Sequence, residues 1–213
     1  MFPIEPTIDE INAVERLRAK GELATSLMLT QAMLERVKDR GLRMRLLFGV
    51  VMCSGLLGLD DVTNRAMADL DTLPQPEFLR ALANMYRAHA EEQNGRAENA
   101  LALLDMNLEA GFLERDDFRI HEYQLFLFKG EALLRLRQAK EALDWLDKAH
   151  ALYPSEKSAR NENEHSIFCW VEPSIQTARA NCLLALDRFE DSFEAAREVI
   201  RRDDGDLATF ARQ

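Results

Sequence analysis

Apolar side chains recur at spacings of three and four residues along most of the chain, and the runs end at glycine or proline. This period is typical of amphipathic helices, whereas a half-buried strand would alternate apolar and polar residues. No alternation of β-branched residues extends far enough to predict a strand. The pattern therefore predicts an all-α chain of ten helices, over residues 7–20, 22–40, 42–57, 61–72, 76–93, 96–110, 116–137, 138–152, 173–186 and 188–203.

The joints between these helices are short, which predicts that consecutive helices lie antiparallel as neighbours. Ten helices then form five hairpins in series. Thr7 and Glu10 have the spacing of a capping box and mark the start of the first helix. The joint at residues 155–171 is the exception, with a polar half followed by an apolar half. It either is a long functional loop, extends the preceding helix or adds a short helix.

Small residues in one window fall at positions that an isolated amphipathic helix does not require. Gly130, Ala142 and Ala149 are separated by 12 and then 7 residues, and Pro154 follows 5 residues later. Stacked helical hairpins need small residues where two helix axes approach closely and bulky residues where a gap must be filled. The window thus predicts one small residue on the first helix of a hairpin and two on the second.

This spacing resembles the tetratricopeptide repeat, with the match running over residues 123–156. Phe126 stands at the family's first aromatic position and Leu146 at its second bulky position. Two residues depart from the family pattern: Lys129 replaces a bulky apolar residue, and Arg137 replaces a glycine in the turn. The resemblance implies an α-α superhelix, a solenoid of about five hairpins that forms a single domain over residues 1–213.

A second copy, at residues 173–206, follows the first with an offset of 50 residues, and the 16 residues beyond the 34-residue repeat fall in the 155–171 joint. In this copy Ala180 matches Gly130, and Ser192 matches Ala142. Two earlier hairpins fit more loosely, and the matching positions are Val14, Gly21 and Ser26 in one and Gly95 and Ala100 in the other. An irregular helical-hairpin array and a plain helical bundle remain alternatives.

The net charge and the cysteine content limit which kinds of partner and which cellular compartment we expect. The formal net charge of −10 argues against nucleic acid and against an anionic membrane surface, because both are bound by clustered Lys and Arg. The least polar run, residues 46–59, is too short to span a bilayer. The N-terminus lacks the apolar core of a signal peptide, and the three cysteines show no metal or disulfide spacing. We expect a reduced, cytoplasmic protein.

Candidate chemistry is sparse. Ser54 lies in a Cys-Ser-Gly stretch, but a nucleophile elbow needs a strand-to-helix turn and this stretch is helical. Glu162, Glu164 and His165 in the long joint have the residue types of a cation site, and a metal-dependent hydrolase is the least favoured alternative. We therefore predict no catalytic residues, no metal and no cofactor, and a protein that is not an enzyme.

The family resemblance implies instead that the first helix of each hairpin lines a concave groove that binds a protein or peptide segment. Carried over residue by residue, the predicted groove consists of Gln124, Leu127, Glu131, Leu134, Arg135, Ser174, Thr177, Asn181 and Leu184, with Ala185 beside them. Leu127 and Thr177 stand where an acidic C-terminal peptide would require lysine, and Glu131 should repel its carboxylate. We predict that such peptides do not bind.

We expect the protein to be a non-enzymatic adaptor, chaperone or assembly factor that binds a neutral or basic partner in this groove. Mixed apolar and polar groove residues suit an amphipathic or extended segment, and net charge −10 favours association with cations. Charged residues at Leu127 and Leu134 should then abolish partner binding. A regulator that senses an effector or peptide in the groove is the alternative function, and self-association is another use of the same faces.

Overall fold

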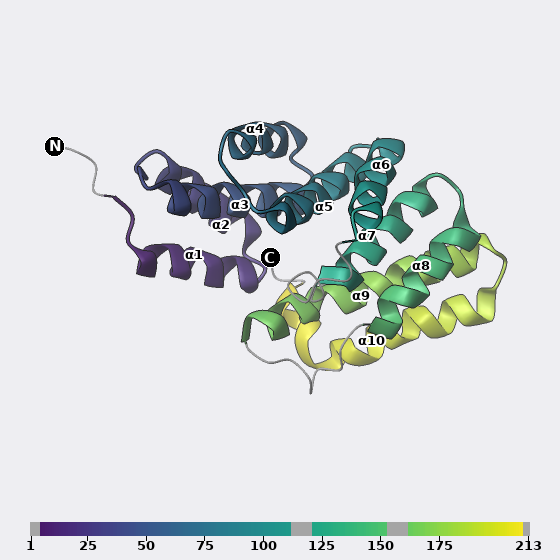
Figure 1. Ribbon diagram of the computed structural model, residues 1–213. Helices are drawn as coiled ribbons and strands as arrows, with labels where there is room; N and C mark the ends of the chain where they lie inside the picture. The colour runs from purple at the N-terminus through teal and green to yellow at the C-terminus, as the bar shows by residue number, and fades with distance from the viewer. Residues whose placement is uncertain (1–4, 112–120, 153–161, 211–213) are drawn as a thin grey trace.

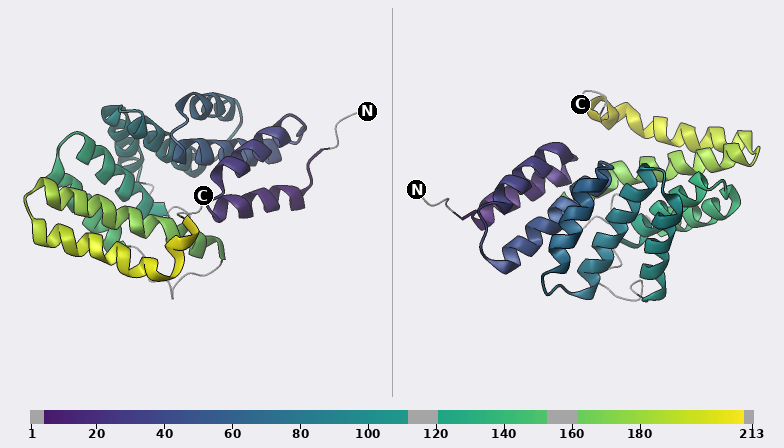
Figure 2. Two further views of the ribbon diagram at one scale, coloured as in Figure 1. Left: turned by 180° about the vertical axis from the view of Figure 1, so that it is seen from behind. Right: turned by 90° about the horizontal axis from the view of Figure 1, so that it is seen from above.

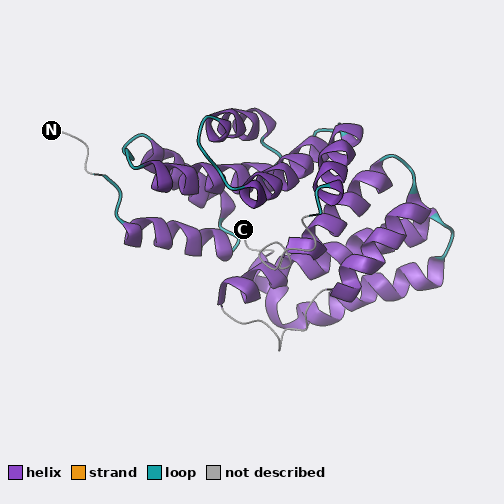
Figure 3. Ribbon diagram, viewed as in Figure 1, coloured by secondary structure: helices purple, strands orange, loops and turns teal. Residues whose placement is uncertain are grey.

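The computed structural model describes residues 5–111, 121–152 and 162–210, with the backbone alone described for 162–172 and 201–210. Within these ranges the chain is helical and no strand occurs (Figure 1 and Figure 3). The all-α prediction is confirmed. The helices are α1 (Ile8–Ala19), α2 (Leu23–Leu34), α3 (Arg40–Leu56), α4 (Asp60–Asp71), α5 (Glu77–Gln93), α6 (Ala97–Glu109), α7 (Glu122–Arg135), α8 (Ala139–Leu152), α9 (Glu162–Ala185) and α10 (Phe189–Phe210).

The helices pack as five consecutive hairpins, α1/α2 to α9/α10, and the hairpins follow one another along a curved array (Figure 1 and Figure 2). The first helices of successive hairpins also contact one another, α1 with α3, α3 with α5, α5 with α7 and α7 with α9. In addition α1 contacts α9, from the other end of the order. The arrangement is that of an α-helical solenoid, as the sequence predicts.

The same turn closes all five hairpins. One residue in each turn has a positive φ, between 58° and 80°, and the amide of the next residue donates a hydrogen bond of 2.8–3.0 Å to the carbonyl five positions earlier. This is the Schellman motif, which ends a helix with a left-handed residue. That residue is Gly21, Gly58, Gly95, Arg137 or Asp187.

A small or hydroxyl-bearing residue follows five positions after each left-handed residue and packs against the first helix of its own hairpin. These residues are Ser26, Thr63, Ala100, Ala142 and Ser192. The position 12 residues before each of them is buried, and it is occupied by Val14, Val51, Ala88, Gly130 and Ala180. The hydroxyls of Ser26 and Ser192 each donate to the carbonyl 12 residues earlier, at 3.2 and 2.8 Å. All five hairpins therefore share one register.

Lys129 and Arg137, the two departures from the family pattern, are accommodated without disturbing this register. Lys129 is buried along its stem, its ammonium pairs with Asp105, and its Nζ lies 4.2 Å from the centroid of the Trp145 ring. A lysine can fill an apolar position in this way when its charged end reaches a partner. Arg137 adopts φ 61°, the conformation that a turn glycine would supply.

The predicted start of the ninth helix was wrong. Helix α9 begins at Glu162, and Pro173 lies inside it. A proline often occupies the first turn of a helix, which made residue 173 the predicted start, but a helix can continue through proline at the loss of one hydrogen bond. The second half of the 155–171 joint is therefore helix, and residues 153–161 and 116–120 lie outside the described ranges. Among the described residues, no helix is both long and apolar enough to cross a membrane.

Gly55 lies where α3 closely approaches α5. A Cβ at Gly55 would lie 2.5 Å from the carbonyl oxygen of Tyr86, whose backbone cannot move without shifting α5. We expect Gly55→Ala to lower the free energy of unfolding by about 1–3 kcal/mol, as overpacking does. Urea denaturation followed by circular dichroism measures this. Gly41→Ala in the same helix meets only the Asp39 side chain, at 3.3 Å, and should change stability much less; equal losses would contradict the close-approach argument.

Substitutions at two of the left-handed turn residues should change the stability of the protein in opposite directions. Arg137→Gly should stabilise the protein by up to about 1 kcal/mol, because glycine removes the steric cost of a positive φ. Gly95→Ala should destabilise it by a similar amount, since a Cβ there meets nothing within 4 Å and only the φ of 78° opposes it. Thermal unfolding compares the two variants with the parent chain. Shifts of the same sign would show that the turn conformation does not control these substitutions.

Candidate functional site

A cavity of about 620 Å³ opens between the first helices of the last three hairpins. We call it the α5–α7–α9 cavity. It has both polar and apolar walls, and its volume is in the range of ligand-binding clefts. Its lining residues are Glu92 and Gln93 from α5, Glu131, Leu134 and Arg135 from α7, and Pro173, Ser174, Thr177, Ala178 and Asn181 from α9.

Six of the nine predicted groove residues line this one cavity: Glu131, Leu134, Arg135, Ser174, Thr177 and Asn181. Leu184 is 54% exposed but is not among the lining residues. Gln124 and Leu127 are only 1% exposed, so the prediction that they face a groove does not describe their position. The first half of α7 is covered by its neighbours, and Gln124 lies in hydrogen-bond contact with the ring of His121, 2.9 Å from Nδ1.

A cluster of three titratable side chains lies at the α5–α7 side of the cavity. His89 and Glu92 are three residues apart on α5 and therefore share one face of the helix, and Glu131 faces them from α7. One ligand atom from each residue lies within 4.8 Å of the others, and Nδ1 of His89 is 3.7 Å from Oε2 of Glu131. Those last two atoms are buried and have no hydrogen-bond partner within the described part of the chain.

Burial dominates the electrostatics of this cluster. It raises the pKa of Glu131 to about 8, with the nearby charge of Glu92 adding to the shift. Burial also lowers the pKa of His89 to about 4. At neutral pH both side chains are therefore largely uncharged. This shift weakens the expected repulsion of an acidic peptide by Glu131, and the binding prediction itself stays a prediction.

Glu92 differs from Glu131 because its carboxylate is paired. Nε of Arg135 donates to its Oε1 at 2.6 Å, and the Gln93 amide donates to its Oε2 at 2.8 Å. The Glu92 side chain is almost fully buried, whereas that of Arg135 is exposed. The ion pair thus fixes the Glu92 carboxylate in the cavity wall and neutralises its charge there.

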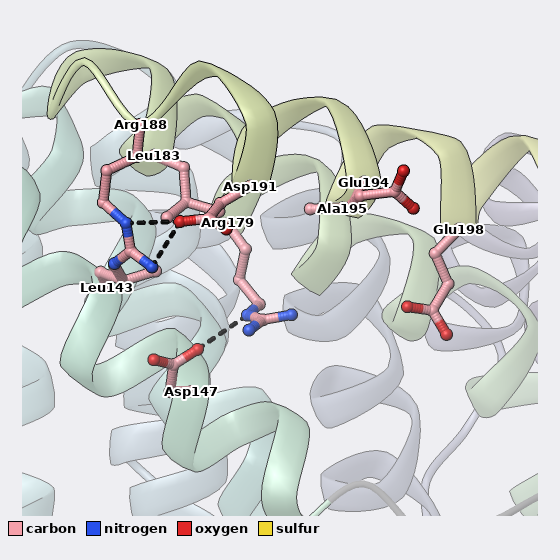
Figure 4. A pocket seen from close by; sticks show the side chains of 9 residues that line it. All are labelled: Leu143, Asp147, Arg179, Leu183, Arg188, Asp191, Glu194, Ala195 and Glu198. Atoms are coloured by element: carbon pink, nitrogen blue, oxygen red, sulfur yellow. Dashed lines mark hydrogen bonds and ion pairs between the residues drawn. The ribbon is translucent and has the colours of Figure 1, made fainter.

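A second, smaller cavity of about 280 Å³ lies between α8, α9 and α10 (Figure 4). Arg179 bonds Asp147 at 2.8 Å, and Arg188 bonds Asp191 at 2.7 Å, so both arginines in its wall are neutralised (Figure 4). The rest of the lining consists of the exposed carboxylates Glu194 and Glu198 and the apolar residues Leu143, Leu183 and Ala195. The Arg179–Asp147 pair ties α9 to α8, whereas Arg188 and Asp191 lie three residues apart within the last hairpin. A neighbouring carboxylate balances the charge of each arginine.

The other candidates from the sequence do not form a described site. The Ser54 hydroxyl is buried in α3 and donates to the Val50 carbonyl at 2.7 Å, which is a packing role. Cys53 and Cys182 are buried free thiols, and burial raises the pKa of both, that of Cys182 to about 11. Glu162, Glu164 and His165 begin α9, and their side chains lie outside the described ones.

Sequence reasoning missed His89 and Glu92. The stretch His-Ala-Glu-Glu at residues 89–92 places both on one face of a predicted helix, so the spacing alone could have marked a candidate pair. Glu131 could join them only through the tertiary structure. The fold and the cavity define the chain as an α-helical-repeat protein. No family model, curated protein or solved structure matches it.

The different burial of the predicted groove residues can be tested directly. Leu127→Glu should unfold the chain or cost more than about 4 kcal/mol, because it places an unpaired charge in the core. Thr177→Glu, on the exposed part of the cavity wall, should change stability by less than about 0.5 kcal/mol. Chemical denaturation distinguishes the two. Equal stability of the two variants would show that Leu127 is accessible to solvent. Only then could a charged substitution at Leu127 serve as a test of partner binding.

Proposed function

We propose that this chain is a non-enzymatic protein-binding module of the tetratricopeptide-repeat type, which holds a short segment of a partner in the α5–α7–α9 cavity. The observation that carries the proposal is the convergence of six predicted groove residues on one cavity. These residues occupy the positions that line the groove in tetratricopeptide repeats. Residues at these repeat positions are expected to form one common surface when the hairpins stack as tetratricopeptide repeats do.

The packing of Gly130 supports the repeat type. A Cβ on Gly130 would lie 2.5 Å from Cγ of Leu146 and 3.3 Å from the Ala142 carbonyl oxygen. The small position on the first helix and the bulky position on the second are therefore in direct contact, which is the role that the family pattern gives them. Leu146 and Ala149 are both fully buried on α8.

The chemistry of the cavity favours a neutral or basic segment with an apolar anchor. Leu134, Pro173 and Ala178 supply apolar surface, while Thr177 and Asn181 supply hydrogen-bonding groups from successive turns of α9. The one arginine of the lining is already paired with Glu92. No cation of the described wall is therefore left for a carboxylate, and the net charge of −10 accelerates encounter with a cationic partner.

The test is selection of binding peptides from a random library on the full chain, followed by affinity measurement with fluorescence polarisation. We expect neutral or basic peptides with apolar anchors, and at least tenfold weaker binding to a Thr177→Arg/Asn181→Arg variant, because two long charged side chains fill the cavity. An acidic C-terminal peptide should not bind.

Glu98→Arg is the matched control, since Glu98 is exposed on α6 and outside the cavity lining. It makes a larger change of net charge than either cavity substitution and should leave peptide affinity unchanged. The proposal is wrong if selected peptides bind the double variant as tightly as the parent chain, or if the Glu98 variant loses affinity equally.

A further inference from the structure

The His89–Glu92–Glu131 cluster has a geometry that neither the hairpin packing nor the peptide-binding proposal requires. Nδ1 of His89 and Oε2 of Glu131 are 3.7 Å apart and both are inaccessible to water. That separation is too long for a hydrogen bond between them. Two buried polar atoms thus face each other without a partner among the described residues, and such atoms in a folded protein call for an explanation.

The separation suits two ligands of one metal ion. Ligands about 2.0–2.1 Å from a tetrahedral Zn²⁺ lie roughly 3.4 Å from each other. The third ligand atom, from Glu92, belongs to the same group within 4.8 Å, a distance that small side-chain movements can close. The bonds from Arg135 and Gln93 leave lone pairs free on the Glu92 carboxylate.

The surroundings hold these ligands in place. The His89 ring stacks on Phe128 with centroids 4.3 Å apart and an interplanar angle of 22°, which restricts the rotation of the imidazole. Nε of Arg135 donates a hydrogen bond to the Glu92 carboxylate and restricts its movement. Glu92 and Glu131 also belong to the wall of the α5–α7–α9 cavity, which supplies an entry path and room for water on the ion.

We propose that His89, Glu92 and Glu131 form a binding site for a single first-row divalent transition-metal ion, with Zn²⁺ as the best match. One imidazole and two carboxylates favour such an ion over Mg²⁺ and Ca²⁺, which prefer oxygen ligands alone. The ion joins α5 to α7 beneath the cavity. The site is independent of which segment, if any, occupies the cavity.

Titration of the chelator-treated full chain with Zn²⁺ by calorimetry, and with Co²⁺ by visible absorption, tests the site. We expect one equivalent to bind and the melting temperature to rise with Zn²⁺ concentration. Glu131→Gln, which keeps the shape of the side chain, and His89→Phe, which keeps an aromatic ring against Phe128, should each weaken binding at least about tenfold.

His150→Phe and Glu98→Gln are the matched controls, because they remove a histidine and a carboxylate from helices outside the cluster. Both should bind the metal as the parent chain does. If His89→Phe fails to fold, the Glu131→Gln result decides. The proposal is overturned if the parent chain binds no equivalent of metal, or if the cluster variants and the controls bind equally. Peptide affinity of the same variants, measured without metal, reports separately on the proposed function.

Discussion

The constraint on which the rest of the structure depends is the left-handed residue at the turn of every hairpin. It reverses the chain in a fixed geometry. As a result, the residue five positions after the left-handed residue always meets the residue seven positions before it. A small or hydroxyl-bearing side chain then lets the two helices approach. Because each hairpin repeats this geometry, successive first helices can pack on one another. They bury one core cluster that extends from α2 to α10, and a second, smaller cluster lies between α1, α2 and α3. Neither the cavity nor its lining would exist without that repeated register.

Glycine meets this constraint at Gly21, Gly58 and Gly95, and a residue with a side chain meets it at Arg137 and Asp187. The left-handed conformation costs a residue with a Cβ about 1–2 kcal/mol. The last two hairpins therefore keep the turn because their packing holds it. Asp is among the residues that tolerate this conformation best, whereas Arg is not, so the α7/α8 hairpin depends most on tertiary support.

The regular spacing of the turns extends over more of the sequence than the resemblance to the tetratricopeptide repeat indicates. Gly21, Gly58 and Gly95 are spaced by 37 residues twice, which marks three equivalent turns, and Thr63 occupies the small position of the second hairpin. The helices and their pairing could be predicted because they follow from local periodicity and short joints. The start of α9 could not, because Pro173 permits both a helix start and a helix interior. The burial of Leu127 could not be predicted either. Leu127 and Glu131 are four residues apart and lie on the same face of α7, so only their contacts with neighbouring hairpins make Leu127 more buried than Glu131.

The candidate site lies where the regular pattern is broken. The Glu92 and Glu131 carboxylates and the His89 imidazole are largely shielded from water, at a cost that an apolar trio would not incur. On the opposite wall, Pro173 interrupts α9 and leaves the carbonyl four residues earlier without its intrahelical donor. Both features reduce stability, and Glu92, Glu131 and Pro173 line one cavity, whereas the small positions follow the rule in all five hairpins. Stability is carried by the repeated hairpin geometry, and this permits polar and irregular groups to gather between α5, α7 and α9. Departures from local rules are expected at binding sites rather than in the supporting core. The meeting of two such departures at a single cavity is therefore a physical reason, separate from any family resemblance, to propose a function there.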